Sequence, residues 1–477
     1  MYFNSLAYIF GFLPIVIIVY FALNKRKCIF AGKIWLVIAS LVFYGWFNVK
    51  YVPLLLLYVL INFSICKLIL KFSKEKNKSK SILIIGILFN LTVLLGFKNC
   101  QFFVDTINNV FKTEFPFVNF IMPLAVSFQT LQQIGFLADS YKNSELKVSL
   151  TDYVLFSVFF PQMIVGPIIK YNETIPQFNQ LRRKIFNHKN FIIGLFVFLV
   201  GFYKKGFLVA PLNDTIIDKI PLLGSLSTLE SWIFCIMEYF HAYLDFSSYI
   251  DMVIGSAMML NIELPINFNS PMQAKNIADF WERWHITFAR FMKDYVYEPL
   301  KKINPKDWFV DLSIMLTCFL GGLWQGVSIC AVLWGFMHGL GFLIYRAWKK
   351  LNFKIPDFLS SIVTFLFVAV AGVFLRVQNI GQMSDITRNL FVYKGDVITD
   401  IQRFNVFDCS TESIWSTAAI LICFVGILLT VCRFSIEGKD LARFVKPNLF
   451  WAFILAMAIV ELLYFYAPPT GFLYYNF

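Results

Sequence analysis

Long apolar runs recur along the whole chain, and they constrain its fold more than any other feature. Thirteen of them lie near 6–23, 34–48, 52–70, 81–97, 120–138, 152–169, 190–210, 230–260, 308–323, 326–345, 357–375, 414–432 and 449–467. Most approach the roughly 20 residues that an α-helix needs to cross a hydrocarbon core. The strands of an outer-membrane barrel would alternate apolar and polar residues, so these continuous runs predict helices.

Charged residues make up only 15% of the 477 residues, against about 25% in a soluble domain. We therefore expect an all-α, polytopic integral membrane protein. Because several runs are short or contain Pro and Gly, about ten or eleven should be transmembrane helices, with re-entrant and interfacial helices beside them. The chain is expected to form one membrane domain, with N-terminal helices over about 1–140, a motif-bearing core over about 150–346 and C-terminal helices over about 357–477.

The formal net charge of +13 comes from short basic clusters between the runs, which indicate membrane topology rather than a nucleic-acid partner. Clusters at 24–27, 71–80, 346–354 and 433–446 are expected in the cytoplasm, because positively charged loops are retained on that side. Both termini and the loop over 376–413 then lie outside.

Several common functional signatures are missing from the sequence. Its nine Cys include no CxxC pair, and none of its four His has ligand spacing to a Cys pair, so no metal site is expected. A Walker-type loop and a GxGxxG motif are also absent, which removes the signature of nucleotide-driven transport. The first apolar run lacks a preceding basic region and a small-residue cleavage site, so it is not expected to be a cleaved signal.

Four stretches contain features that a plain helical bundle does not need. The first, "FPQMIVGPIIKYNETIPQF" at 160–178, holds Pro161, Gly166, Pro167 and Pro176 in an apolar context. Prolines at this density break a helix, which is tolerated at membrane depth only where the segment is buried in protein or lines a cavity. We expect a re-entrant, cavity-lining segment; the alternative is a kinked span followed by a loop.

The second stretch, "YFHAYLDFSSYIDM" at 239–252, places Asp245 and Asp251 among aromatic and aliphatic residues. His241 and Asp245 are four residues apart, on one helical face, and are expected to pair. Carboxylates inside a span are functional candidates. The alternative is a structural role, in which they bond nearby serines or an Arg of a neighbouring helix.

The third stretch, "DFWERWHITFARFMKDYVYEPL" at 279–300, is expected to form an amphipathic helix at an interface or along a polar vestibule, capped by Asn276 or Asp279. One face is aromatic or apolar: Trp281, Trp284, His285, Phe288, Phe291, Met292 and Tyr295. Arg283 and Arg290 lie among the remaining residues, where guanidinium groups can bind phosphate or carboxylate. His285 can serve either packing or chemistry.

The fourth stretch, "GGLWQGVSICAVLWGFMHG" at 321–339, is almost wholly apolar but holds Gln325 and His338, which are costly to bury without partners. In an uninterrupted helix these two lie about 20 Å apart and roughly 140° off a common face. They can be neighbours only if the helix is broken between Gly326 and Gly335. An amide orients a substrate but takes no proton near neutral pH, so Gln325 cannot be a base.

In this order the stretches resemble the membrane-bound O-acyltransferase (MBOAT) family, in particular its bacterial branch that contains the alginate O-acetyltransferase membrane subunit. The resemblance covers nearly the whole chain, including "SFQTLQQIGFLADSYKN" at 127–143, and is strongest from "YLDFSSYIDMVIG" to "LWGFMHG". It implies a helical ring around a funnel, with an acyl donor entering from the cytoplasm and an acceptor outside. The implied reaction transfers an acyl group, acetyl in this branch, to a hydroxyl of a cell-surface polysaccharide or peptidoglycan.

The resemblance also implies roles for individual residues. The family's "GLWxG" motif normally holds a histidine regarded as catalytic, where this chain has Gln325, while His338 matches the histidine of the "WGxxHG" pattern. An imidazole in a dry cavity can act as the base, so His338 is the first candidate and His285 the second. Further candidates, for substrate binding or structural polar roles, are Asp245, Asp251, Arg283, Arg290, Trp324, Pro167 and Gln162.

Gln325 leaves three possibilities open. His338 or His285 takes over as base, the chain has lost the chemistry and serves as a scaffold, or position 325 was deliberately altered. A transporter is the competing class, because carboxylates within a span and an irregular Pro-rich segment suit an ion or lipid pathway. The absence of an evident internal repeat in the sequence speaks against a transporter.

Partners follow from the topology and the resemblance. No segment outside the runs exceeds about 40 residues, too few for a folded domain that presents a polysaccharide. A separate extracytoplasmic acyltransferase is therefore expected to receive the acetyl group, with a cell-surface glycan as acceptor. Acetyl-CoA or another acyl donor is expected as a substrate and not as a tightly bound cofactor. Membrane lipids should surround the chain in the cytoplasmic (inner) membrane of a bacterium.

Overall fold

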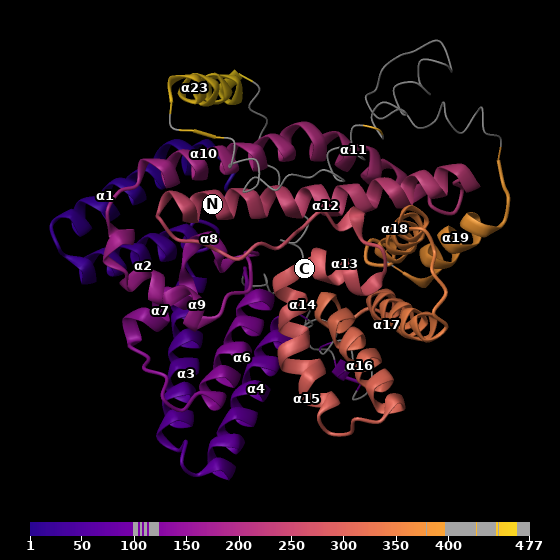
Figure 1. Cartoon of the computed structure of the whole chain (residues 1–477), viewed down its shortest axis with the longest axis horizontal. Coiled ribbons are helices and arrows are strands. Elements are labelled where there is room, and N and C mark those ends of the chain that lie inside the picture. Colours follow the sequence, from indigo (N-terminus) through magenta and orange to yellow (C-terminus); the bar gives the residue numbers. More distant parts are fainter. Residues whose placement is uncertain are drawn as a thin grey trace. The chain divides into compact units, whose positions relative to one another are not determined.

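The computed structural model of the chain describes residues 1–98, 124–377, 379–395 and 448–464, together with a few isolated residues. These residues form helices and connecting segments, and no strand occurs among them (Figure 1). The expected all-α class is therefore confirmed. The run predicted at 414–432 lies outside the described residues, so the number of membrane spans stays a prediction.

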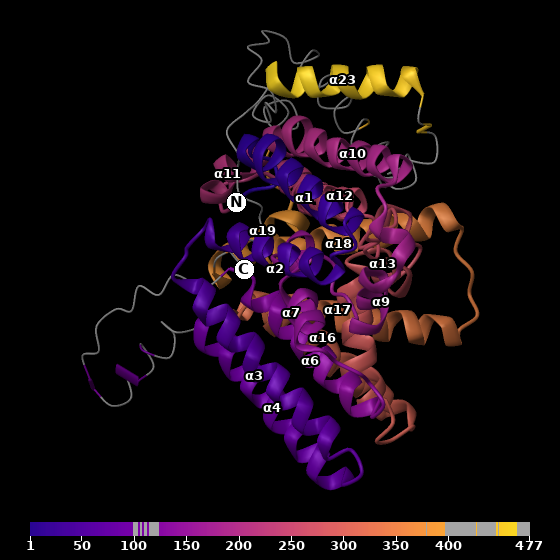
Figure 2. The same cartoon turned by 90° about the vertical axis from the view of Figure 1, so that its left-hand side faces the viewer.

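Contacts divide the chain into two units, of which the first contains Met1–Phe198, Met252–Pro265 and Val445–Asn476. Its helices are η1 (Ala7–Phe12), α1 (Leu13–Lys25), α2 (Ile29–Gly45), α3 (Tyr51–Lys71), α4 (Lys76–Lys98), α6 (Val126–Lys142), α7 (Leu150–Val158), α8 (Phe160–Met163), α9 (Tyr171–Asn179), η2 (Leu181–Lys184), most of α10 (His188–Tyr203) and α23 (Leu449–Tyr464). Within it α3 and α4 form a hairpin against which α6 packs (Figure 2).

The second unit contains Leu199–Asp251 and Ile266–Phe444. Its helices are η3 (Lys204–Val209), α11 (Ala210–Lys219), η4 (Ile220–Leu222), most of α12 (Thr228–Met259), η5 (Pro271–Gln273), α13 (Ile277–Arg283), α14 (Ile286–Met292), η6 (Lys293–Tyr297), α15 (Glu298–Lys301), α16 (Asp307–Gln325), α17 (Ile329–Lys350), α18 (Asp357–Val373) and α19 (Ile380–Phe391).

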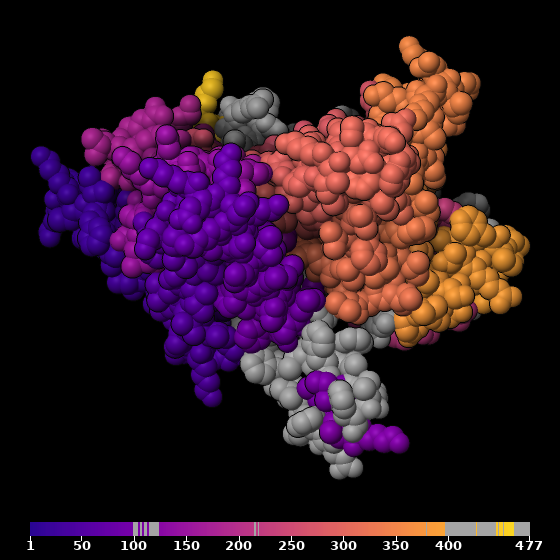
Figure 3. All heavy atoms as spheres, turned by 90° about the horizontal axis from the view of Figure 1, so that it is seen from below, coloured from indigo at the N-terminus to yellow at the C-terminus, as the bar shows by residue number. Residues whose placement is uncertain are grey.

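Many helices are apolar enough to cross a membrane. Six in the described part of the chain reach the necessary length: Ala7–Lys25, Tyr51–Lys71, Lys76–Lys98, His188–Asn213, Asp307–Gln325 and Ile329–Lys350. Three shorter apolar helices cover Ile29–Gly45, Asp357–Val373 and Leu449–Glu461. Helices α3 and α4 expose aliphatic side chains such as Leu57, Ile85 and Leu88. Figure 3 shows the surface of this N-terminal part of the chain in indigo to violet. Such an apolar exterior suits a lipid environment.

The Pro-rich stretch at 160–178 is broken, as the sequence predicts. Helix α7 ends just before it, α8 is a single turn, and residues 164–170 are irregular before α9 begins. Pro167 lies buried in this irregular part. A Cβ built on Gly166 would lie 2.3 Å from Gln162 Cα, so the backbone folds back on itself at a distance that only glycine permits. The position of the stretch within a bilayer stays a prediction.

Side-chain amides satisfy the backbone where α7 ends. Gln162 and Gln132 donate through Nε2 to the Phe156 carbonyl at 2.8 and 2.9 Å. Gln129 Nε2 donates to the Ser157 carbonyl at 2.7 Å. Since an unpaired carbonyl in an apolar interior is unfavourable, these buried amides explain how an interrupted helix is tolerated here.

The stretch at 279–300 is not one helix, contrary to the expectation. It breaks between α13 and α14, where His285 has φ 43° and ψ 51°, in the left-handed region. The backbone groups at the break bond to a segment earlier in the chain: Asn269 N–H donates to the Arg283 carbonyl and Ile286 N–H to the Asn267 carbonyl, both at 2.9 Å. This tertiary pairing overrides the continuous helical periodicity of the sequence.

The start of α13 agrees with the prediction. Asn276 is its N-cap, and the side-chain oxygen accepts a hydrogen bond from the Asp279 N–H at 2.9 Å. This bond satisfies one of the amides that a helix leaves unpaired at its first turn.

Helices α16 and α17 form a tight hairpin. Helix α16 ends at Gln325, and Ser328 caps α17 by accepting from the Ala331 N–H at 3.1 Å. The two backbones touch at glycines: a Cβ built on Gly335 would lie 2.5 Å from the Cys318 carbonyl oxygen, and one on Gly322 would lie 2.4 Å from that of Ala331. Small residues permit this close packing of helices.

Candidate active site

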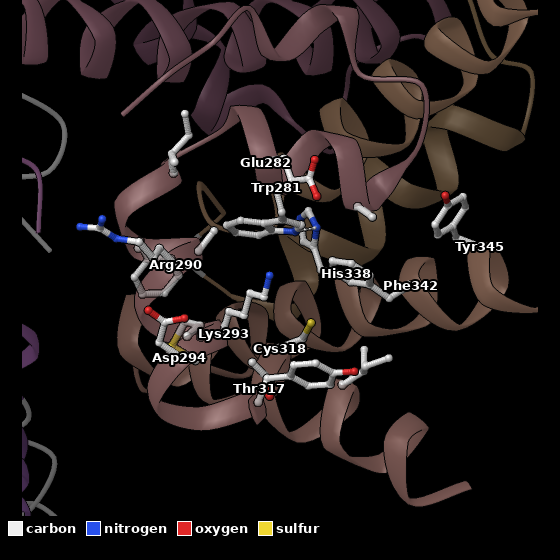
Figure 4. Close-up of a pocket in the computed structure, with 18 of the residues that line it drawn as sticks. Trp281, Glu282, Arg290, Lys293, Asp294, Thr317, Cys318, His338, Phe342 and Tyr345 are labelled. Carbon is white, nitrogen blue, oxygen red and sulfur yellow. Dashed lines mark hydrogen bonds between the residues drawn. The ribbon is translucent and has the colours of Figure 1, made fainter. Parts of the chain in front are cut away.

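A cavity of about 600 Å³ lies in the second unit between α13, α14, η6, α16 and α17 (Figure 4). Its volume falls within the roughly 300–1,000 Å³ of small-molecule sites. The wall is mainly apolar, and its polar residues include Glu282, Arg290, Lys293, Asp294, Thr317, Cys318, His338, Tyr345 and Arg346. Among the described residues, no group of three or more His, Cys, Asp and Glu is arranged to hold a metal ion.

His338 lines this cavity from α17 and is only 2% exposed. Its ring packs 4.6 Å from that of Trp334, and Trp281 Nε1 donates a hydrogen bond to Nδ1 at 3.3 Å (Figure 4). An indole N–H can only donate, so Nδ1 is the acceptor and the proton of the neutral imidazole sits on Nε2. His338 therefore presents a hydrogen-bond donor at Nε2. A base role would require Trp281 to release Nδ1.

The two arginines predicted as anion-binding residues differ in their positions. Arg290 lines the cavity from α14. Arg283 is not part of the lining: its Nε lies 2.6 Å from Asp279 Oδ1 on its own helix, and its Nη1 donates to the Asn269 carbonyl at 3.1 Å. Arg290 therefore belongs to the wall of the cavity, whereas Arg283 stabilises the end of α13.

Gln325, Trp324 and His285 are buried and do not belong to the lining of the cavity. Trp324 stacks on Phe288 with ring centroids 4.7 Å apart, and His285 packs 6.4 Å from Trp324. His285 Nδ1 lies 3.3 Å from Asn267 Oδ1. Burial lowers the pKa of His285 to about 3, so its ring is neutral.

The hairpin does not bring Gln325 and His338 together, although the helix breaks between them. Residues Gly335 and Gly339 abut Cys318 and Met315, so His338 is level with the middle of α16. At 1.5 Å per residue this level is roughly 10–14 Å from Gln325 along the axis. His338 thus occupies its own place in the cavity wall and does not replace an imidazole at position 325.

The carboxylates of α12 form buried ion pairs with lysines that the sequence analysis did not single out. Lys205 Nζ lies 2.5 Å from Asp245 Oδ1, and Lys204 Nζ lies 2.7 Å from Asp251 Oδ2. Both lysines belong to the π-turn η3. His241 forms its ion pair with Glu238, at 3.9 Å, and the charge of Asp245 also acts on His241; the close ion pair of Asp245 with Lys205 was not predicted. Two adjacent lysines within the apolar run near 190–210 could have indicated a buried partner for these carboxylates.

Gln162 and Pro167 belong to the first unit, and the cavity belongs to the second. Their contacts are those of the irregular segment after α7. Several residues of the cavity were not singled out from the sequence, among them Thr317, Cys318 and Tyr345. They occupy ordinary positions on apolar helices, so only the hairpin geometry identifies them.

An all-helical chain with several apolar spans and a ligand-sized cavity holding a buried imidazole is a multi-pass membrane protein that acts on, or binds, a small molecule. The membrane-bound O-acyltransferase family matches residues 107–376, more than half of the chain. The chain belongs to this family, as the motifs predicted, and is a membrane-bound acyltransferase.

Three relatives show how widely the similarity extends. The peptidoglycan O-acetyltransferase of Helicobacter pylori is 33% identical over 100% of this chain and 97% of its own length. The probable alginate O-acetylase AlgI of Pseudomonas aeruginosa is 29% identical over 90% of this chain and 82% of its own length. The teichoic acid D-alanyltransferase of Bacillus subtilis is 25% identical over 52% of this chain and 67% of its own length.

Proposed function

We propose that the chain transfers an acetyl group from a donor on the cytoplasmic side, such as acetyl-CoA, toward a hydroxyl of a cell-surface polysaccharide or peptidoglycan. The cavity carries this proposal, because His338, Arg290 and Lys293 line it together. The cationic groups suit the phosphates of an acyl-CoA. The names of the relatives support acetyl as the group transferred and a glycan as the acceptor.

In this proposal His338 acts on the acyl carbonyl through Nε2. When a hydroxyl attacks a thioester, negative charge develops on the acyl oxygen, and a preorganised N–H donor lowers the barrier. The hydrogen bond from Trp281 supports this role, since it keeps the ring proton on Nε2. Gln325 takes no proton in this scheme and keeps a structural role at the end of α16.

The side of the membrane from which the donor enters is inferred from charge. Arg346, in the cavity wall, begins the basic cluster at 346–354 that ends α17. Because basic loops are retained in the cytoplasm, the donor enters the cavity from the cytoplasmic side. By the same rule both termini lie on the extracytoplasmic side of the inner membrane. A separate extracytoplasmic acyltransferase then receives the acetyl group and presents it to the glycan, while lipids surround the apolar helices.

Inverted membrane vesicles, whose cytoplasmic face is accessible, test the proposal directly. Radiolabelled acetyl-CoA is added outside, and covalent label is measured in glycan or protein inside. Label that appears only when the chain is present supports the proposal. Acetyl-CoA or acetate that enters without covalent label indicates a transporter, and vesicles that match empty controls indicate a scaffold. If Gln325→His restores label in the last case, the chain is a weakened relative of active enzymes.

A further inference from the structure

Glu282 is a carboxylate in the wall of the same cavity. Helix α13 turns Ala278, Trp281 and Glu282 toward the cavity, residues that share one helical face because they are spaced i, i+3 and i+4. Figure 4 labels Glu282 in the wall of the cavity that His338 also lines. Within the described part of the chain, the structure records no hydrogen bond or ion pair that engages the Glu282 side chain. The carboxylate is therefore free to meet a ligand.

The hydrogen bond between Trp281 and His338 leaves the proposed reaction without an imidazole base, and the Glu282 carboxylate can take that role. A hydroxyl that attacks a thioester must lose its proton to a base. With Nδ1 occupied by the indole N–H and the ring proton on Nε2, His338 has no lone pair directed to the cavity. An ionised carboxylate, in contrast, offers several acceptor positions. The proton acceptor must therefore be sought elsewhere in the wall.

We propose that Glu282 is the general base that takes the proton of the acceptor hydroxyl, while His338 donates a hydrogen bond to the acyl oxygen. The assignment rests on the proposed function of the cavity. In the step, the hydroxyl oxygen bonds to the acyl carbon and its proton moves to the Glu282 carboxylate. The carbon–sulfur bond then breaks, and the thiolate takes the proton from Glu282, so ester and thiol form and the carboxylate is regenerated.

The surroundings of Glu282 support a chemical role over a structural one. Its side chain is exposed toward the cavity, so it is not needed to fill the core. Arg283, the adjacent cation, is held by Asp279 of the same helix, and neither residue lines the cavity. Asp294 is a second carboxylate in the wall, on η6, and is the competitor that an experiment has to separate from Glu282.

The test compares two nucleophiles on the purified full-length chain. Chitotetraose provides sugar hydroxyls, which need a base, and at high concentration it stands in for the acceptor hydroxyl that the partner acyltransferase supplies. Hydroxylamine attacks as a neutral amine without prior loss of a proton, and its product, acetohydroxamate, is measured by its colour with ferric ion. The variants are Glu282→Gln, Asp294→Asn and, as a control outside the cavity wall, Glu298→Gln on α15. Binding of acetyl-CoA is measured for each variant.

Glu282→Gln is expected to lower acetyl transfer to chitotetraose by about 100-fold or more, the usual loss of a general base. Acetohydroxamate formation and acetyl-CoA binding should stay at the parent level, and added formate should restore transfer to the sugar in Glu282→Ala. Equal rates for Glu282→Gln and the parent, equal losses with both nucleophiles, or a selective loss in Asp294→Asn would each overturn the assignment. A parent chain that acetylates neither nucleophile would overturn the proposed function itself.

Discussion

The contact between α16 and α17 predicts a strong effect of one added methyl group. In Gly335→Ala the new Cβ would lie 2.5 Å from the Cys318 carbonyl oxygen and 3.3 Å from Gly322 Cα. Both atoms belong to backbone, so neither can move aside as a flexible side chain would. The helices must separate, and overpacking of this kind costs about 1–3 kcal/mol. Gly335 also lies one turn before His338, so the shift moves the imidazole, and a displacement of about 1 Å can lower a rate roughly 100-fold.

Gly372→Ala is the matched control, because the Cβ built on Gly372 of α18 has no atom within 4 Å. There the change from Gly to Ala should be neutral or stabilise the helix by up to about 1 kcal/mol. Thermal unfolding of both variants in detergent, followed by tryptophan fluorescence, measures stability, and labelled acetyl-CoA measures transfer. If Gly335→Ala unfolds and reacts like Gly372→Ala, the two helices are not in contact at this level.

Three further predictions address charge and topology. Asp245→Asn removes the carboxylate that pairs with the buried Lys205 and should destabilise the fold by about 3–5 kcal/mol. The double variant Lys205→Met with Asp245→Leu should recover most of this loss, and thermal unfolding of both variants measures the difference. Arg290→Ala should weaken acetyl-CoA binding by roughly tenfold or more without a change in unfolding, and Arg283→Ala, outside the cavity, should weaken binding less; equilibrium binding compares them. A reporter that is active only in the cytoplasm, fused after Phe477, should stay inactive, and activity would refute the assigned topology.

The membrane helices could be predicted from the sequence because they depend on local properties. Apolar runs near 52–70 and 308–323 correspond to α3 and α16 within a few residues. The Pro-rich break after α7 and the Asn276 cap were also accessible, since proline geometry and N-cap chemistry act over a few residues. Where neighbouring residues alone determine the backbone conformation, that conformation can be predicted from the sequence.

Features that depend on distant partners could not be predicted. The break at His285 is stabilised by Asn267, 18 residues away, while the periodicity of 279–300 continues through it. The ion pair of Asp245 spans 40 residues to Lys205, whereas the sequence analysis considered His241, nearby serines and an Arg of a neighbouring helix. A helical periodicity predicts which residues lie on one face of a helix, but not which other part of the chain that face contacts.

The candidate site shows the same division. The sequence reduced the possible imidazoles to His338 and His285, and only the tertiary structure separates them, because His338 lines the cavity and His285 does not. The indole of Trp281 that sets the tautomer of His338 lies 57 residues away in the chain. Roles that depend on which ring nitrogen carries the proton therefore require the three-dimensional arrangement.

The central claim is that His338 acts on the acyl group in this cavity, and the most direct measurement is the initial rate of acetyl transfer from labelled acetyl-CoA by full-length His338→Ala. His188→Ala is the matched control, since His188 is exposed at the start of α10 and outside the cavity. The account predicts that the rate of His338→Ala falls by at least about 100-fold at unchanged expression, while His188→Ala matches the parent. Transfer at the parent rate by His338→Ala would contradict the claim. If His285→Ala also reacted at the parent rate, imidazole chemistry in the membrane core would be excluded in favour of a scaffold or transport role.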